Sequence, residues 1–367
     1  MKKILFILPN LQGGGAERVT LTVIKGLDRK KFKPTLFLIK NKGVYFNEVP
    51  DDVEVIYGIE EKDNLKLLFP LVLIKLLCVA KSANIIVGSL ELYATYLAVF
   101  CGKLLRRPVI GWIHTDISKY PRALKTMHKS LIKLLYPCLN KVIAVSQSSA
   151  EALNSLVPSI THKTVVIHNP IPIDIIKMRS NQSVISDIEK PIVLGVGRLG
   201  PEKGFDILIK AHASLMQNGI RHNLVILGEG VERKNLEDLV RKLKVEDSVF
   251  MLGFKKNPYM WMKQASVFVL SSRFEGLPTV MIEAMASGAP LVACKCNSGP
   301  VEILEDGRYG ILVEPENVNE LASAIARLLQ DKELSVKLKK DGLCRANDFS
   351  PNCVIPKFEK CFLEVTS

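Results

Sequence analysis

The sequence lacks several patterns that define whole classes of protein. Its eight cysteines show no paired Cys-X-X-Cys spacing, which disfavours a disulfide framework or a structural zinc site and fits reduced thiols in the cytoplasm. The longest apolar run, residues 67–74, is far shorter than the ~18 residues of a membrane-spanning helix. The apolar start does not fit a signal peptide either, because Pro9 ends it after residues 4–8. We therefore expect a cytoplasmic protein with no segment that crosses the membrane.

Acidic residues are scarce in the first half of the chain. Residues 1–190 hold 27 Lys and Arg against 15 Asp and Glu, whereas residues 191–367 hold 23 against 22. Four basic residues recur at helical spacing within residues 101–145: Arg122, Lys125, Lys129 and Lys133. Apolar residues recur on another face of the same expected helix: Leu124, Met127, Leu131, Leu134 and Cys138.

This amphipathic basic helix indicates contact with an anionic membrane surface, at the inner face of the plasma membrane. An ordinary surface helix with its apolar face in the core is the alternative. A nucleic acid would also be attracted by the charge, but no recognition motif accompanies it, so we expect no nucleic-acid partner.

Apolar runs alternate with helical sequence along the whole chain. This alternation predicts an α/β fold with two doubly wound, Rossmann-like domains facing across a cleft. We expect an N-terminal domain at residues 1–172, a linker at 173–190 and a C-terminal domain at 191–351. A final helix at about 352–367 is expected to return to the first domain.

A glycine-rich segment, residues 10–18, follows the first predicted strand and reads NLQGGGAER. Glycines let a ligand approach the backbone, and the helix that follows favours an anion at its N-terminus. The dinucleotide fingerprint GxGxxG nevertheless fails, because Arg18 stands at its third glycine. The second predicted strand ends at Lys40 rather than at an acid that would hold a ribose, so a nicotinamide cofactor is not expected.

The second half is organised around residues 267–288, which read VFVLSSRFEGLPTVMIEAMASG. An apolar run, a turn and a helix with Pro278 in its first turn predict a strand, loop and helix unit. Free N–H groups at such a helix end attract an anion. Glu275 in the loop and Glu283 on the helix flank this site, and each carboxylate can accept from sugar hydroxyls. The unit therefore predicts a nucleotide-sugar site.

Two basic residues, Arg198 and Lys203, follow the strand predicted at 192–196. A diphosphate that leaves without a bound metal needs cations, and Arg and Lys both supply them. The chain contains no Asp-X-Asp motif. We therefore expect neither a metal nor a cofactor.

These motifs resemble glycosyltransferase family 4, the retaining, nucleotide-sugar-dependent enzymes of the GT-B fold within the glycosyl transferases group 1. The resemblance covers nearly the whole chain and is specific in its C-terminal half. It implies that Glu275 faces the donor sugar, that Glu283 binds the ribose, and that Arg198 and Lys203 bind the phosphates. It also implies backbone contacts to the donor from four residues: Gly276, Leu277, Pro278 and Thr279.

In the first half, the family's Gly-Gly-Ala-Glu segment, which lines the cleft near the donor diphosphate, matches Gly14, Gly15, Ala16 and Glu17. The resemblance further implies that His114, at the end of a predicted strand, contacts the donor sugar, and that Phe254 packs on the nucleobase. Ser89 and Glu91 follow another strand and are candidate acceptor contacts. Residues 297–304 look like family members that use N-acetylhexosamine donors in surface-glycan assembly.

The combined prediction is a metal-independent, retaining hexosyltransferase. It would move a sugar from UDP-N-acetylhexosamine to a lipid-linked or glycan acceptor at the membrane surface. The N-terminal domain would bind the acceptor, and the C-terminal domain would bind the nucleotide sugar. Two alternatives stay open: a GT-B nucleotide-sugar epimerase, which needs no lipid acceptor, and a non-catalytic glycan-binding scaffold.

Overall fold

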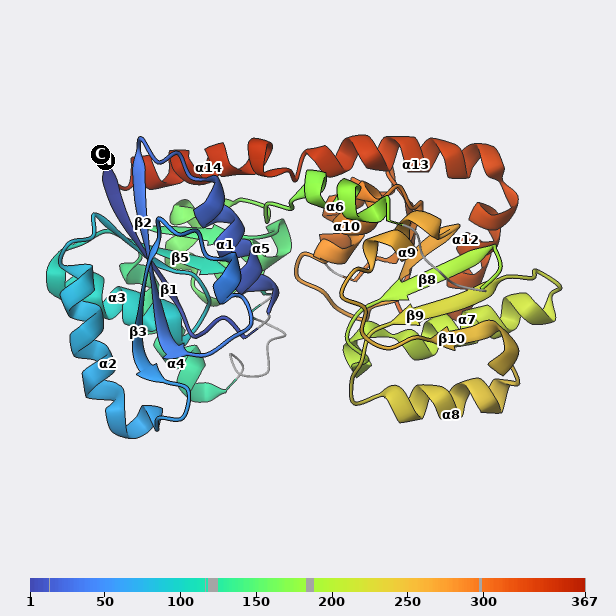
Figure 1. The fold of residues 1–367 in the computed structure, drawn as a ribbon, viewed down its shortest axis with the longest axis horizontal. Coiled ribbons are helices and arrows are strands. Elements are labelled where there is room, and N and C mark those ends of the chain that lie inside the picture. Colours follow the sequence, from blue (N-terminus) through green and yellow to red (C-terminus); the bar gives the residue numbers. More distant parts are fainter. Residues whose placement is uncertain (13, 116, 118–124, 183–187, 297–298, 367) are drawn as a thin grey trace. The chain divides into compact units, whose positions relative to one another are not determined.

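The computed structural model describes residues 1–366 apart from 13, 116, 118–124, 183–187 and 297–298. The chain forms two compact units (Figure 1). The first unit contains Met1–Pro170 and Pro351–Ser367, and the second contains Ile171–Ser350.

The first unit is built on a parallel sheet of seven strands in the order β3-β2-β1-β4-β5-β6-β7. Its strands are β1 (Lys2–Leu8), β2 (Phe32–Asn41), β3 (Glu54–Glu60), β4 (Ile85–Gly88), β5 (Val109–Ile113), β6 (Lys141–Ala144) and β7 (Thr164–Val166). Its helices are α1 (Gly15–Gly26), α2 (Leu65–Ala80), α3 (Tyr93–Leu105), α4 (Thr126–Leu135), α5 (Gln147–Leu156) and α14 (Pro351–Glu364), with short 3-10 turns η1 (Phe46–Glu48), η2 (Tyr136–Cys138) and η3 (Pro158–Lys163). Helices cover both faces, which is why the central strands read as continuous apolar runs.

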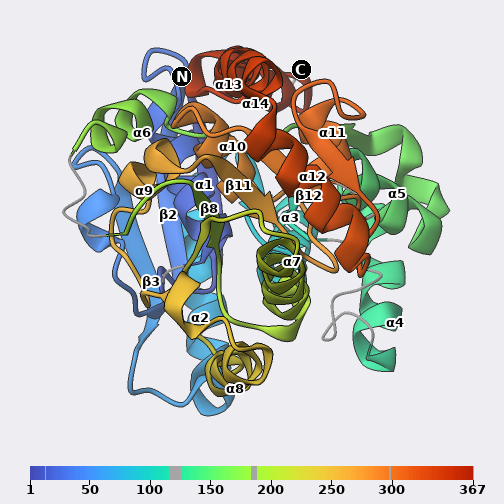
Figure 2. The same ribbon diagram turned by 90° about the vertical axis from the view of Figure 1, so that its right-hand side faces the viewer.

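The second unit repeats this plan with six parallel strands in the order β10-β9-β8-β11-β12-β13. Its strands are β8 (Ile192–Val196), β9 (Asn223–Leu227), β10 (Val249–Met251), β11 (Val267–Leu270), β12 (Leu291–Cys294) and β13 (Ile311–Val313). Its helices are α6 (Ile173–Ser180), α7 (Phe205–Gln217), α8 (Arg233–Leu243), α9 (Tyr259–Gln264), α10 (Thr279–Ala286), α11 (Gly299–Leu304), α12 (Val318–Gln330) and α13 (Lys332–Asn347), with η4 (Pro201–Lys203) and η5 (Glu246–Ser248). Helices α7 and α12 lie side by side against this sheet (Figure 2).

In both sheets the strand order reverses beside the first strand of the unit. Strand β1 lies between β2 and β4, and β8 lies between β9 and β11. At such a switch point the loops on the carboxyl edge run off in opposite directions and leave room for a ligand. The predicted doubly wound α/β fold is confirmed in each unit.

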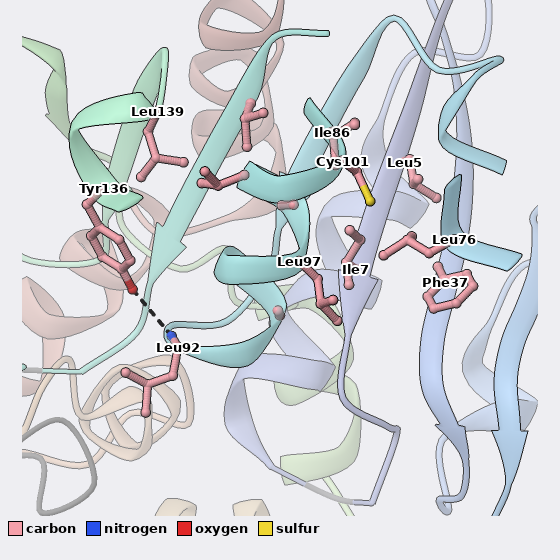
Figure 3. Close-up of a cluster of buried hydrophobic side chains, with 14 of the residues drawn as sticks. Leu5, Ile7, Phe37, Leu76, Ile86, Leu92, Leu97, Cys101, Tyr136 and Leu139 are labelled. Atoms are coloured by element: carbon pink, nitrogen blue, oxygen red, sulfur yellow. Dashed lines mark hydrogen bonds between the residues drawn. The ribbon is translucent and has the colours of Figure 1, made fainter. Parts of the chain in front are cut away.

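Apolar side chains from strands and helices form the core of the first unit (Figure 3). Leu5, Ile7 and Phe37 from the strands are at most 1% exposed and pack with buried residues of α2 and α3. Removing each such side chain from water stabilises the folded state by roughly 1.5–3 kcal/mol. Tyr136 accepts a hydrogen bond from the backbone N–H of Leu92 at 3.3 Å, so its hydroxyl is satisfied inside this core.

Helix α14 packs against the first sheet. The ring of Phe362 lies 6.0 Å from that of Phe6 and 6.1 Å from that of Phe32, both edge to face. The backbone N–H of Asp28 donates to Glu359 at 2.7 Å. The core of the first unit therefore includes residues from both extremes of the sequence.

The segment expected as a linker, residues 173–190, begins as helix α6 of the second unit. Ile173 and Ile176 are 2% and 0% exposed, and α6 packs on α9 and α10. The first part of this stretch therefore packs within the second unit, because two isoleucines one turn apart are buried, while Ile175 and Met178 beside them are 44% and 65% exposed.

The expected basic helix is the shorter helix α4, and Arg122 and Leu124 lie outside the described residues. His128 and Ile132 face the core, whereas Met127 and Leu134 are 59% and 68% exposed. The face expected to be apolar therefore points largely to solvent, because another stripe of the same helix packs on its neighbours. In the described part of the chain, no helix combines the length and apolar composition that crossing a bilayer requires. All eight cysteines are free thiols.

Two buried histidines, His212 and His222, form a hydrogen-bonded pair in the second unit. His212 Nδ1 lies 2.9 Å from His222 Nε2, and His212 Nε2 lies 2.9 Å from the hydroxyl of Ser248. His222 Nδ1 faces the carbonyl of Ile220 at 3.0 Å, so it must donate. With both rings neutral, His212 Nδ1 donates to His222, and His212 Nε2 is an acceptor for the Ser248 proton, for which the Val245 carbonyl at 3.3 Å competes. Burial lowers the pKa of His212 to about 3 and also lowers that of His222.

We expect this pair to make the protein less stable in acid. Between pH 3 and the usual histidine pKa of 6.5, the unfolded chain binds protons that the native pair does not bind, so the free energy of unfolding rises with pH. At pH 5, protonation of His212 in the unfolded chain lowers the free energy of unfolding by about 2 kcal/mol, and above pH 6.5 this effect vanishes. Denaturant unfolding at pH 5 and 7 measures it.

The variant carrying His212→Asn and His222→Asn should lose the part of this pH dependence that the pair contributes, whereas the part from the buried His114, whose pKa burial also lowers to about 3, should remain. His162→Asn, at an exposed histidine, should keep it. An unchanged dependence in the double variant would contradict the assignment.

Candidate active site

Two residues predicted for the donor site meet at the switch point of the second sheet. Lys203 ends η4 after β8, and Glu275 lies in the loop after the neighbouring strand β11. Lys203 Nζ lies 2.5 Å from Glu275 Oε1, and their side chains are 23% and 12% exposed. The hydroxyl of Ser272 donates to the same carboxylate oxygen at 2.7 Å. Residues 72 positions apart thus form one charged cluster at the carboxyl edge.

The backbone beneath this ion pair is fixed by close packing of the two loops. Gly204 has φ +61°, and a Cβ at this position would come within 2.2 Å of the Ser271 carbonyl oxygen. The hydroxyl of Ser271 donates to the Lys203 carbonyl at 2.9 Å. Only glycine permits this approach, so the chain places Lys203 before a turn that no other residue would allow.

Sequence reasoning missed Arg273, which binds the two loops together. Its guanidinium donates to the Pro201 carbonyl at 2.6 Å and pairs with Asp206 at 2.9 Å and with Glu316. Burial would raise the pKa of Asp206, but the hydrogen bond and charge of Arg273 hold it below its usual range. The position of Arg273 two residues before Glu275 was the available signal, although its partners are far away in the sequence.

Arg198 occupies the same loop as Lys203 in a more open position. Its side chain is 75% exposed, and it pairs with Glu202 at 2.7 Å. An exposed pair of this kind contributes little stability, so an anionic ligand can compete for the guanidinium.

Helix α10 begins directly after the loop that carries Glu275. Leu277 and Pro278 are buried, whereas Gly276, Thr279 and Glu283 are partly exposed. The backbone N–H of Gly299 donates to the Gly276 carbonyl at 3.1 Å and fixes the loop from the other side. Phe254, in the loop after β10, is 77% exposed.

The first unit gathers a second set of predicted residues at its own switch point. Glu91, 5% exposed, accepts hydrogen bonds from the backbone N–H of His114 at 3.1 Å and from the Thr115 hydroxyl at 2.8 Å. Burial raises the pKa of Glu91, and the charge of Glu17 acts in the same direction. Glu91 therefore holds the end of β5 in place from inside the protein.

His114 has one ring nitrogen without a partner. Its ring donates to the backbone of Ser89, and burial lowers its pKa to about 3, so the imidazole is neutral. Within the described part of the chain, its buried Nε2 has no hydrogen-bond partner, and neither does the buried hydroxyl of Ser89. Buried polar atoms of this kind are rare and call for an explanation. In this tautomer Nε2 is ready to accept from a hydroxyl of a ligand.

The glycine-rich segment lies at the same edge. Helix α1 begins at Gly15, with Gly14 as its N-cap and Glu17 in its first turn. A Cβ on Gly14 would come within 2.2 Å of Glu17 Oε2, so the carboxylate lies over the glycine.

Lys125, Lys129 and Lys133 are exposed on and just before α4. Among the described residues, no group of three or more His, Cys, Asp or Glu side chains is arranged to hold a metal ion.

Two family models match the chain. Residues 178–343 match the model for glycosyl transferases group 1, and residues 13–175 match that for glycosyltransferase family 4. The chain is 30% identical over 359 residues to a Campylobacter jejuni protein, covering 95% of this chain and 96% of that one. This relative is named N-acetylgalactosamine-N,N'-diacetylbacillosaminyl-diphospho-undecaprenol 4-alpha-N-acetylgalactosaminyltransferase.

A second relative is the amylovoran biosynthesis glycosyltransferase AmsD of Erwinia amylovora, 26% identical over 98% of this chain and 99% of its own length. Among solved structures, HepE of Anabaena in complex with UDP has a TM-score of 0.82 and 24% identity, covering 99% of this chain and all of that one. The fold is therefore GT-B. The chain is a glycosyltransferase and belongs to the glycosyl transferases group 1, with a first half of the family 4 type.

Proposed function

We propose that this glycosyltransferase moves a sugar from UDP-N-acetylhexosamine to a lipid-linked or glycan acceptor, with retention of the anomeric configuration and without a metal. The observation that carries the proposal is the contact between Lys203 and Glu275 at the switch point of the second sheet. It places a cation for phosphate next to a carboxylate for sugar hydroxyls.

The relatives support the donor and the acceptor class. The name of the Campylobacter jejuni protein specifies transfer of N-acetylgalactosamine to a sugar on diphospho-undecaprenol. Solved structures of HepE contain UDP, and one contains UDP-glucose. A polyprenyl-linked acceptor also suits the charge of the first unit, where Lys125, Lys129 and Lys133 are exposed and would face an anionic membrane. We accordingly assign the enzyme to the inner face of the plasma membrane.

Transfer breaks the bond between the anomeric carbon and the diphosphate oxygen and forms a bond from that carbon to the acceptor oxygen. The acceptor proton passes to the departing phosphate on the same face of the sugar, which retains the configuration. Lys203 and Arg198 stabilise the charge that grows on the diphosphate. The ammonium of Lys203 has three donors, so it can hold Glu275 and a phosphate oxygen together.

The other predicted residues orient the substrates. We assign Glu275 to hydroxyls of the donor sugar, Glu283 to the ribose, and Phe254 to the base. In the first unit, Nε2 of His114 accepts from a sugar hydroxyl, and the glycine-rich turn at Gly14, Gly15, Ala16 and Glu17 admits a ligand close to the backbone. The backbone of residues 276–279 contacts the donor.

Lys203→Ala and Glu275→Gln should each lower transfer at least 100-fold, since each removes a preorganised charge or acceptor from the reacting site. Release of UDP in the presence of acceptor measures the rate. Lys210→Ala is the matched control, because Lys210 also forms an ion pair but with Asp206 on the flank of α7. A rate near wild type in a correctly folded Lys203→Ala protein would sink the assignment.

One UDP-N-acetylhexosamine should raise the melting temperature of the protein, equally with magnesium and with EDTA, because a ligand bound only by the native state stabilises it. Arg198→Ala should reduce this shift. A shift that appears only with magnesium would overturn the metal-free mechanism.

Two results would favour the alternatives. Interconversion of the donor without acceptor would indicate an epimerase, and absence of any shift across UDP-, GDP- and ADP-sugars would indicate a scaffold.

A further inference from the structure

Helices α2, α3 and α4 present a continuous apolar surface on the first unit. They lie next to one another on the sheet (Figure 1). Large apolar side chains on them are exposed by 42–77%: Leu67, Phe69, Leu71, Ile74, Tyr93, Phe100, Leu104, Met127 and Leu134. Contiguous exposed apolar patches of this kind mark sites of interaction. Helix α2 is apolar on all sides, which is typical of a helix that is covered.

A groove of about 810 Å³ runs through this surface. Side chains of all three helices line it, among them Phe69, Leu73, Tyr93, Leu104, Leu131 and Leu134. Of the described side chains that line it, Lys103 alone is charged. A volume of this size fits one extended small molecule rather than a protein helix.

The charged side chains of the three helices have one sign. The three helices carry Lys66, Lys75, Lys103, Lys129 and Lys133, and none of them contains an aspartate or glutamate. A ligand that fills the groove and satisfies this field has an apolar chain and an anionic head. A partner helix with neutral or basic flanks would leave the lysines unmatched.

One end of the groove lies at the edge that carries the candidate site. The lining includes Tyr93, the first residue of α3, and Leu104, near its last, so the groove follows the helix for about 17 Å. Helix α3 starts directly after the turn that holds Ser89 and Glu91. Leu92 at this start is fixed by its hydrogen bond to Tyr136 (Figure 3).

We propose that the α2–α3–α4 groove binds the apolar chain of the lipid that carries the acceptor sugar, with Lys66 and Lys129, in the first turns of α2 and α4, meeting the lipid phosphates. The inference rests on the proposed lipid-linked acceptor and adds the site that recognises its lipid part. The chain lies along α3, and the head group with its sugar is held at the carboxyl edge of the first sheet. The groove thereby selects acceptors by their lipid and not only by their glycan.

The test is calorimetric titration of the full chain with farnesyl diphosphate, in saturating UDP so that the donor site is occupied. The wild type should bind this probe, and inorganic pyrophosphate should not bind in its place. Leu134→Glu should weaken binding at least tenfold, because it places a carboxylate in the groove. Phe100→Asp is a second variant at another exposed lining position, and both should melt within a few degrees of the wild type.

Met127→Glu is the matched control. Met127 is on the same helix, is similarly exposed and does not line the groove, so its variant should bind within twofold of the wild type. Absence of binding by the wild type would mean that the groove is not a lipid site. Equal effects of Leu134→Glu and Met127→Glu would mean that this surface contacts lipid in general, as it would a bilayer, and not through the groove. Because titration needs no turnover, it separates this result from failure of the proposed transferase reaction.

Discussion

The ion pair between Lys203 and Glu275 is the interaction on which the site of the second unit depends. Both side chains are mostly withdrawn from water, so each needs the other: removing one partner leaves a charge without compensation. The pair also joins the loops that follow β8 and β11, which are fixed below it by Gly204 and Arg273. In the proposed reaction, a phosphate that reaches Lys203 meets a positive charge that is already oriented, so little reorganisation is needed.

The two units use the same strand order for different chemistry. In the second unit the switch point offers cations and a helix N-terminus, which suits an anion. In the first unit it offers a buried carboxyl, Glu91, and a neutral imidazole, His114, whose pKa values are shifted by burial in the direction of the uncharged form. Both oxygens of Glu91 already accept hydrogen bonds from the end of β5, whereas Nε2 of His114 has no partner among the described residues and can accept from a hydroxyl. This difference between the units follows from burial at equivalent positions of one architecture.

Sequence patterns located the strands well because buried parallel strands leave a local signal. The strand predicted at residues 192–196 is β8, and the apolar run predicted as a strand at the start of residues 267–288 is β11. Lys203 and Glu275 were both candidate site residues, but their contact was not predicted, because the sequence does not show that β8 and β11 are neighbours. The role of Arg273 and the burial of Glu91 were missed as well, since each depends on partners that no local pattern specifies. Periodicity shows that a helix has two faces, and only packing decides which one is covered.

Helix α14 determines when the first unit can complete its folding. Its core residues Phe6 and Phe32 are covered by Phe362, so this unit is discontinuous in the sequence, whereas the second unit is one uninterrupted segment. During synthesis, residues 1–170 leave the ribosome with part of their sheet uncovered, and the whole second unit is made before the missing helix emerges. The domain translated first is thus completed last, and its nascent form is the one that a chaperone would have to protect.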